Sequence, residues 1–213
     1  MVVRVRLGTP KNSVFSADEK RRLPERSEGK NSPVDYFSDA ARRVRLGTPY
    51  KFRRKYLKEI FMKEALKEAK KAFDKEEVPV GAIIVKDGKI IARAHNIKET
   101  KKDSTCHAEI LAIKKACKKL DSWRLIDCEM YVTLEPCSMC AGALINSRLK
   151  KIYIGTDDGK TGACGSVLNL LEDYKFNHKI EVEKYILKEE CEALLKEFFK
   201  FLREKKKSEK RSV

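Results

Sequence analysis

The stretch EMYVTLEPCSMCAGALINS, residues 129–147, contains the pattern that decides the fold. Its first part, residues 129–134, predicts a β-strand, and residues 138–147 predict a short apolar helix. Cys137 and Cys140 lie at the junction, in Cys-x-x-Cys spacing. The start of a helix directs backbone N–H groups and the positive end of the helix dipole toward one point. Thiols at such a point lose their protons more readily, which suits them to bind a metal ion.

A second short motif, His107-Ala108-Glu109, begins the preceding predicted helix, residues 107–120. Two cysteines spaced by one helical turn can reach a single ion, and His107 supplies a third ligand from the neighbouring helix. Three protein ligands leave the fourth position of tetrahedral zinc to water, which is typical of a catalytic zinc site. Bound zinc lowers the pKa of that water to about 7 and so provides hydroxide at neutral pH. Glu109 is predicted to carry protons from the water to a ring nitrogen and then to a leaving amine.

Each motif is weak alone, because redox pairs and halves of zinc ribbons also contain Cys-x-x-Cys. A second Cys-x-x-Cys, needed for a structural zinc ribbon, is absent from the sequence. A thioredoxin-like role would leave His107 and Glu109 unexplained. The order H-x-E followed by P-C-x-x-C is typical of zinc-dependent deaminases of cytosine or adenine.

The flanking segments predict the rest of the fold. Apolar residues at three- and four-residue spacing predict an amphipathic helix from about Tyr50 to Phe73. Residues 79–85 and 90–95 read as two strands joined by a tight turn at Asp87-Gly88. Strands at 151–155 and 180–185, a short helix near Val167 and a C-terminal helix built on residues 191–199 follow. This alternation favours an α/β fold, a three-layer α/β/α sandwich with a mixed five-stranded sheet.

From Ala65 to the C-terminal helix, the chain resembles the bacterial tRNA-specific adenosine deaminases of the cytidine/deoxycytidylate deaminase superfamily. The matching stretches are Val78–Ala82, His95-Asn96, His107–Ile110, Tyr131–Cys137, Lys160–Ala163, Asn177-His178 and Phe198-Phe199. The resemblance implies a cytidine deaminase-like fold and one zinc ion per subunit, held by His107, Cys137 and Cys140. It also implies a homodimer that converts the wobble adenosine of a tRNA anticodon loop to inosine.

The resemblance further implies roles for residues that would contact the RNA. Asn96 would hydrogen-bond the purine, in a pocket lined by Val80, Ala108 and Leu134. Asp158, Lys160 and Asn177 would hold sugar or backbone groups of flanking nucleotides, and Phe199 would touch RNA while Phe198 packs in the core. Structural readings remain open beside these: Asn96 as a strand-end cap, Asp158 and Lys160 as loop charges, and Asn177 as a turn residue.

One residue departs from the family pattern. Cys106 directly precedes the histidine ligand, where alanine is commoner, and it could compete for the metal. Because the side chain of His107 faces the zinc, we expect Cys106 to face elsewhere as a small buried thiol. The chain has seven cysteines, and no secretory signal peptide is recognisable. These features indicate a reducing, cytoplasmic location.

Charge and repeats suggest how the chain is divided. The formal net charge is +16, a balance that fits either a polyanion partner or a solvated, lysine-rich surface. Residues 1–49 hold two copies of Arg-Val-Arg-Leu-Gly-Thr-Pro and few large apolar residues, so we expect an extension without a core of its own, disordered or spurious. A functional tandem arm and a transit peptide remain alternatives. Residues 50–203 are expected to form the deaminase domain and residues 204–213 a basic tail.

Two other functions remain open. The same chemistry could act on free guanine, cytosine or a nucleotide such as dCMP. A catalytically inactive RNA-binding scaffold that keeps zinc for stability is the third possibility, although the intact Glu109 argues against it. No apolar run approaches the ~20 residues of a transmembrane helix, so no membrane partner is expected.

Overall fold

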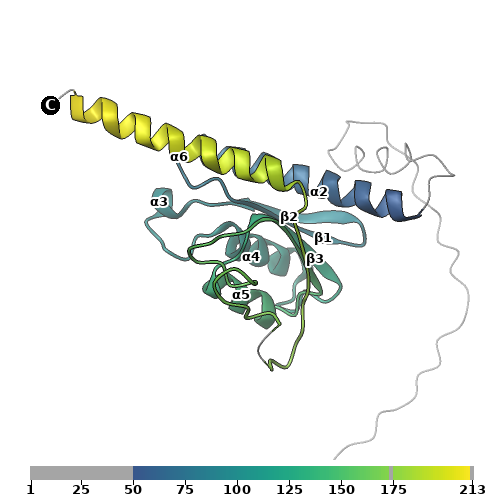
Figure 1. Ribbon diagram of the computed structural model, residues 1–213. Helices are drawn as coiled ribbons and strands as arrows, with labels where there is room; N and C mark the ends of the chain where they lie inside the picture. The colour runs from purple at the N-terminus through teal and green to yellow at the C-terminus, as the bar shows by residue number, and fades with distance from the viewer. Residues whose placement is uncertain (1–49, 173–174, 212–213) are drawn as a thin grey trace, which may run out of the picture.

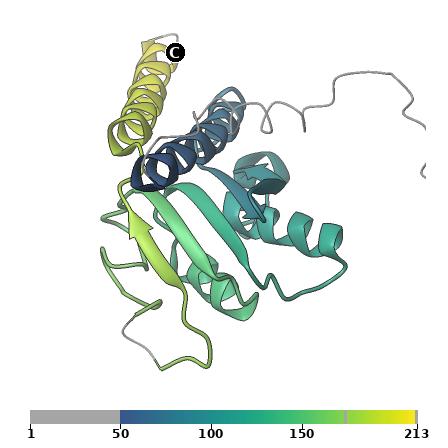
Figure 2. The same ribbon diagram turned by 90° about the vertical axis from the view of Figure 1, so that its right-hand side faces the viewer.

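The computed structural model describes residues 50–172 and 175–211, so the predictions for residues 1–49 lie outside the described part. The elements run in the order α2 (Tyr50–Phe73), β1 (Gly81–Lys86), β2 (Lys89–His95), α3 (Lys98–Lys101), α4 (Ala108–Leu120), β3 (Cys128–Leu134), α5 (Ser138–Asn146), β4 (Lys151–Thr156), β5 (Glu181–Lys184) and α6 (Lys188–Arg211). Figure 1 shows α2 and α6 together on one side of the sheet. The view in Figure 2 shows α4 and α5 on the other side. The predicted three-layer sandwich is confirmed.

The five strands form one mixed sheet in the order β2-β1-β3-β4-β5. Strand β1 pairs antiparallel with both β2 and β3, whereas β3, β4 and β5 run parallel. The hairpin between β1 and β2 turns at Asp87 and Gly88, whose φ angles are 49° and 70°. Positive φ at both central residues suits the right-handed twist of the flanking strands, which is why this sequence makes the turn.

Strand β1 is buried on both faces because each face meets helices. Ala82 and Ile84 belong to the larger apolar cluster, which includes residues of α4 and α5. Ile83 and Val85 point the other way and pack with Phe61 of α2. This explains why the strand reads as a continuous apolar run, as expected for a central strand covered twice.

Gly81 allows α2 to lie close to the start of β1. A Cβ atom at this position would come within 2.0 Å of the Ala65 carbonyl oxygen and 2.5 Å of the Ala69 nitrogen. Both atoms are backbone and cannot move aside alone. The glycine therefore fixes how α2 sits over the end of the sheet that carries the candidate site.

Three segments differ from the sequence-based expectation. The helix predicted near Val167 is wrong: the segment forms turns, with the Val167 and Leu168 N–H groups both donating to the Gly162 carbonyl at 3.1 Å. Helix α3 was not anticipated. Helix α6 continues to Arg211, so most of the expected tail is helical. None of the helices described has the length and apolar character needed to cross a membrane.

Candidate active site

The two motifs meet because their helices begin side by side at one end of the sheet. His107 precedes the first residue of α4, and Cys137 precedes the first residue of α5. Asn96, just after β2, accepts a hydrogen bond from the Ala108 N–H at 2.8 Å and so caps α4. Both helix starts thus direct their N–H groups toward the same small region.

His107, Cys137 and Cys140 form a cluster suited to hold a metal ion. The Nδ1 atom of His107 lies 3.8 Å from the Cys137 sulfur and 3.7 Å from the Cys140 sulfur. The three ligand atoms all lie within 4.8 Å of one another. Bond lengths of about 2.0 Å to nitrogen and 2.3 Å to sulfur place tetrahedral zinc ligands roughly 3.5–3.8 Å apart. The three residues therefore fit a zinc ion with one position left open.

The environment favours a thiolate at Cys137, whereas a hydrogen bond with Cys137 and burial raise the pKa of the Cys140 thiol. Hydrogen bonding with the Cys140 thiol and with His107 lowers the pKa of Cys137 to about 4. Cys140 itself is fully buried. A thiolate is the form that binds a metal, so the protein preorganises at least one ligand in its bound state.

Glu109 lies in the first turn of α4, two residues beyond His107. Its side chain is almost entirely buried, and this burial raises the pKa of its carboxyl group. It also lines the cavity next to His107 and Cys137. A carboxyl group in this place can take a proton from water and return it to a substrate.

A cavity opens over this cluster. Four residues expected at the substrate line it: Val80, Asn96, Leu134 and Asp158. Ala108 lies behind the wall and is fully buried. The amide oxygen of Asn96 is used by the helix cap, which leaves its NH₂ group available to donate to a ligand.

Lys160 and Phe199 do not line this cavity. They line an adjacent groove between the 157–161 loop and α6, together with Lys196 and Arg203. Asn177 lies away from both, and its side-chain oxygen accepts a hydrogen bond from Arg148 at 2.7 Å. The structure thus places the His107–Cys137–Cys140 cluster, the cavity over it and the groove near one another, but not Asn177.

The carboxylate of Asp158 shapes its own loop. It accepts hydrogen bonds from the Lys160 N–H at 2.9 Å and from the Thr161 hydroxyl at 2.6 Å. Thr161 also lines the cavity. The reading of Asp158 as a loop residue therefore has direct support, and a contact to a nucleotide would have to share this carboxylate.

Cys106 faces away from the metal cluster, as expected. Its thiol donates to the Asp103 carboxylate, with the sulfur 3.4 Å from the oxygen. Burial raises the pKa of this thiol. A protonated thiol with its own partner is a poor competitor for the metal ion.

Sequence reasoning missed Glu135 as a functional residue. Its side chain has no exposure to solvent, and its carboxylate accepts hydrogen bonds from the backbone N–H groups of Asp158, Cys164 and Ser166 at 2.8–3.1 Å. The Ser166 hydroxyl also donates to it, and Lys184 lies 3.6 Å away. The sequence did contain a signal for this role, because Glu135 stands between an apolar strand and Pro136, where its side chain is expected to be buried. A buried charge needs several hydrogen-bond partners.

Glu77 is the second residue that the sequence did not reveal. Its buried carboxylate accepts the Glu99 N–H at 3.0 Å and the Thr100 N–H at 2.6 Å, which are N–H groups of the second and third residues of α3. Both Glu77 and Lys98 line the cavity. A distant side chain therefore caps the short helix that forms one wall of the site.

Comparison with known proteins places this geometry among deaminases. Residues 57–203 match the model of the MafB19-like deaminases. The chain is 52% identical over 155 residues to a tRNA-specific adenosine deaminase of Bacillus subtilis, covering 73% of this chain and 96% of that protein. It is 56% identical over 146 residues to the Aquifex aeolicus protein of the same name, covering 68% of this chain and 96% of that protein.

A solved structure agrees with the sequence relatives. It comes from a study of A-to-I editing by deaminases that act at the wobble position of transfer RNA, and it matches with a TM-score of 0.62 and 40% identity. The match covers 64% of this chain and 99% of the solved one. The family match at residues 57–203 thus takes in all five strands, and the final turns of α6 lie beyond it.

Proposed function

We infer, on the premise that the chain belongs to the MafB19-like deaminases and among them to the tRNA-specific adenosine deaminases, that it converts adenosine to inosine at the wobble position of a tRNA anticodon loop. The observation that carries this function is the closed arrangement of His107, Cys137 and Cys140 beside the buried Glu109, beneath a cavity open to solvent. The wobble base lies in a single-stranded loop, so it can be turned into such a cavity at modest cost.

We propose zinc as the metal, because one imidazole and two thiols are ligands that zinc prefers. When bound, the ion supplies Lewis acidity that makes water a good nucleophile at neutral pH. The remaining work belongs to the protein side chains. Glu109 takes one proton from the attacking water and delivers it to N1 of the adenine ring. It then passes the second proton to the exocyclic amine, so that the C6–N bond breaks, ammonia leaves and C6 keeps the oxygen.

The cavity walls supply orientation. Asn96, held by its bond to the Ala108 N–H, donates its NH₂ group to an acceptor on the purine ring. Val80 and Leu134 lie on the apolar parts of the wall and pack against the base. Asn96 caps α4, the helix that begins directly after His107 and carries Glu109. We therefore expect Asn96 and this helix to move as one unit. This rigidity favours an attack geometry fixed before the base arrives.

We propose that two copies form a homodimer. Met139 at the start of α5 and Val167 and Leu168 in the loop between β4 and β5 are apolar side chains exposed in the single chain. Exposed apolar groups close together often mark a protein interface. Light scattering of the purified chain measures the number of subunits.

We propose a cytoplasmic location. All seven cysteines are free thiols, which fits a reducing cytoplasm, where tRNA is also found.

The substrate is tested by comparing two reactions of the zinc-loaded protein. Inosine is measured in an anticodon stem-loop, and ammonia release is measured from free guanine and cytosine. We expect inosine in the RNA and no release from the free bases. Release from a free base without inosine in the RNA would favour a deaminase of free bases. Repeating the assay with a chain that begins at Tyr50 tests whether activity requires residues 1–49.

A further inference from the structure

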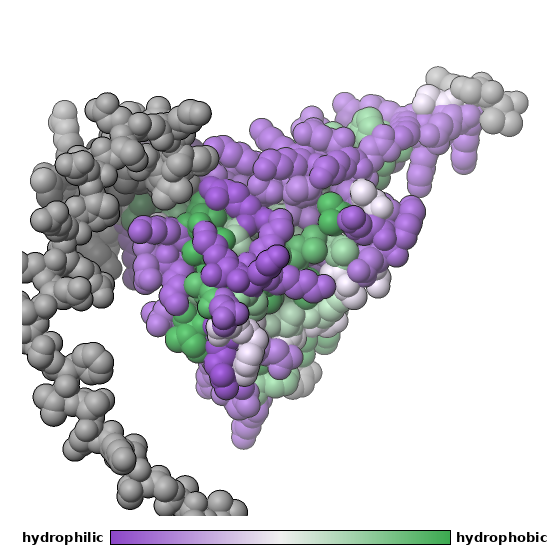
Figure 3. All heavy atoms as spheres, turned by 180° about the vertical axis from the view of Figure 1, so that it is seen from behind, coloured by the Kyte–Doolittle hydropathy of each residue, from purple (hydrophilic) through white to green (hydrophobic). Residues whose placement is uncertain are grey.

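Helix α6 carries a basic stripe beyond the part that the family match covers. The match ends at residue 203, whereas α6 continues to Arg211. Residues 200–210 contain six basic and two acidic side chains. Figure 1 shows this end of α6 extending past the sheet and α3 into solvent, and Figure 3 shows that its surface is hydrophilic.

The projecting end of α6 is fixed to the domain by its opposite face. Phe73 of α2 packs against Phe198 and Phe201, with ring centroids 5.4 Å and 5.8 Å apart. One turn further on, Lys205 Nζ lies 2.7 Å from the Glu76 carboxylate, just after α2. The face at 198, 201 and 205 is therefore anchored, and the helix leaves the domain in a defined direction.

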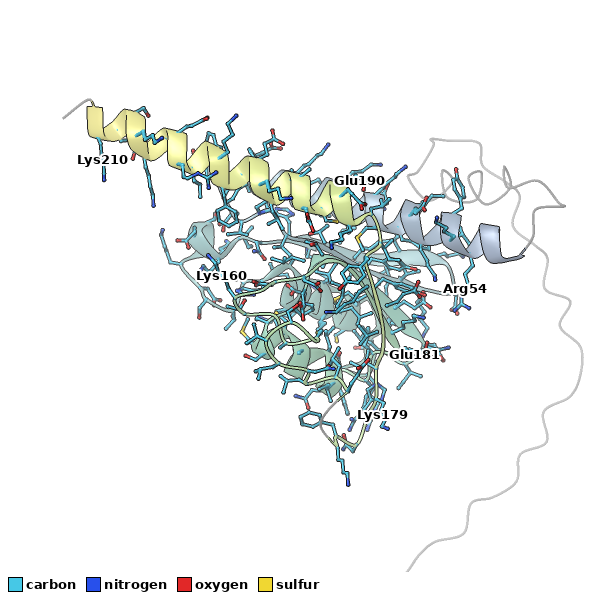
Figure 4. The ribbon with its side chains drawn as sticks, viewed as in Figure 1. Arg54, Lys160, Lys179, Glu181, Glu190 and Lys210 are labelled. Atoms are coloured by element: carbon cyan, nitrogen blue, oxygen red, sulfur yellow. The ribbon has the colours of Figure 1, made fainter. Side chains whose placement is uncertain are left out.

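The face of α6 that lines the groove continues onto the projecting end of the helix. Lys196, Phe199 and Arg203 line the groove beside Lys160, together with Asp157 and Glu192, and Glu192 pairs with Lys196 at 2.9 Å. Positions three, four and seven residues beyond Arg203 lie on the same face of a helix, and they hold Lys206, Lys207 and Lys210. With a rise of 1.5 Å per residue, Lys210 lies about 10 Å further along the axis than Arg203. Figure 4 shows Lys160 and Lys210 on the same side of the molecule.

These lysines have no use within the fold. Among residues 50–172 and 175–211, no acidic side chain forms an ion pair with Lys206, Lys207 or Lys210. Since repulsion between neighbouring like charges costs stability, a solvated lysine cluster on a rigid helix fits a partner of opposite charge. The groove starts at the loop of Asp158 and Thr161, which also borders the base cavity, so the stripe leads away from the catalytic site.

We propose that Lys206, Lys207 and Lys210 bind phosphate groups of the tRNA outside the anticodon loop, on the adjoining stem. This inference rests on the proposed function, because the base cavity fixes where the loop lies. The three lysines lie further along α6 than the groove does. Their ammonium groups would therefore meet nucleotides beyond those that contact the groove. Lysine suits this role, since phosphate contacts give affinity and register without reading sequence.

The test replaces the three lysines in the full chain, as Lys206→Gln, Lys207→Gln and Lys210→Gln together. The matched control is Lys89→Gln, Lys118→Gln and Lys119→Gln, three exposed lysines at the ends of β1–β2 and α4 remote from the cavity. Affinity is measured against salt for two probes, a full-length tRNA and a single-stranded oligonucleotide of the loop alone. The turnover number is measured with saturating tRNA.

We expect the α6 variant to bind full-length tRNA at least about tenfold more weakly at low salt, with the salt slope reduced by about 2–3. Its binding to the loop oligonucleotide and its turnover at saturation should match the unaltered protein, and the control should keep the original salt slope. An equal salt slope for the α6 variant and the control, or an equal loss on the loop oligonucleotide, would overturn the inference. If the unaltered protein forms no inosine in either RNA, the proposed function fails instead, whatever the binding shows.

Discussion

At the scale of single residues, Glu135 connects the metal cluster to the loop over the cavity. It stands two residues before Cys137 and holds the backbone of the 158–166 loop through its carboxylate. Gly162 allows this contact, because a Cβ there would come within 2.6 Å of the Glu135 carboxylate. A single buried charge therefore sets the position of Thr161 at the cavity mouth.

Glu135→Gln should destabilise the protein by about 2–4 kcal/mol, since an amide cannot accept from every buried donor that now meets the carboxylate, although Lys184 keeps its ion pair with Asp157. We also expect the KM for RNA to rise more than kcat falls, because the loop borders the substrate. Urea unfolding and steady-state kinetics measure both effects. Glu181→Gln, at an exposed partner of Lys151, is the control and should change little. Unchanged stability of Glu135→Gln would show that the loop does not depend on this carboxylate.

At the scale of elements, helix α3 is stabilised by the side chain of Glu77, which comes from the segment between α2 and β1. Its four residues have no apolar periodicity and no buried member. Burial opposes the ionisation of Glu77, but hydrogen bonds from the Thr100 and Glu99 N–H groups outweigh it and hold the pKa of this carboxyl below its usual value. The wall of the cavity that α3 forms thus depends on a charged cap.

This lowered pKa predicts how stability changes with acidity. A carboxylate whose folded pKa is below its unfolded pKa stabilises the fold fully at pH values above the unfolded pKa. That contribution is lost as the pH falls through the folded pKa, below about 4.3. We expect Glu77→Gln to cost about 1–2 kcal/mol at pH 7 and much less near pH 3. Unfolding followed by circular dichroism across this range measures it, and a cost independent of pH would contradict the role of the charge.

Two glycines give a matched pair for testing how the elements pack. Gly81→Ala places a methyl group against the backbone of α2, so we expect a loss of about 2–4 kcal/mol. Gly142 of α5 has no atom within 4 Å of an added Cβ, and Gly142→Ala should stabilise the helix by about 0.5–1 kcal/mol. Thermal unfolding at low protein concentration compares them. Similar effects of the two changes would argue against the close approach of α2.

At the scale of the whole molecule, the sequence predicted most of the architecture and the metal cluster. Strand β3 and the starts of α4 and α5 carried local signals: a buried apolar run and ligand residues at fixed spacing. What it could not predict depends on contacts between distant segments. Helix α3 needs Glu77, and the segment near Val167 gives its N–H groups to Gly162 and Glu135 instead of forming a helix. Lys160 and Phe199 were each expected to contact RNA, which stays a prediction, and only the fold shows that the two residues line one groove.

The central claim is that this cluster and Glu109 together remove the amine from a tRNA adenosine. It is tested most directly by sequencing inosine at the wobble position of tRNA treated with the unaltered chain and with Glu109→Gln, each at a measured zinc content. We predict inosine with the unaltered chain and none above background with Glu109→Gln, while both bind one zinc ion per chain. Inosine formed at a similar rate by Glu109→Gln, or none formed by the zinc-loaded unaltered chain, would contradict the account.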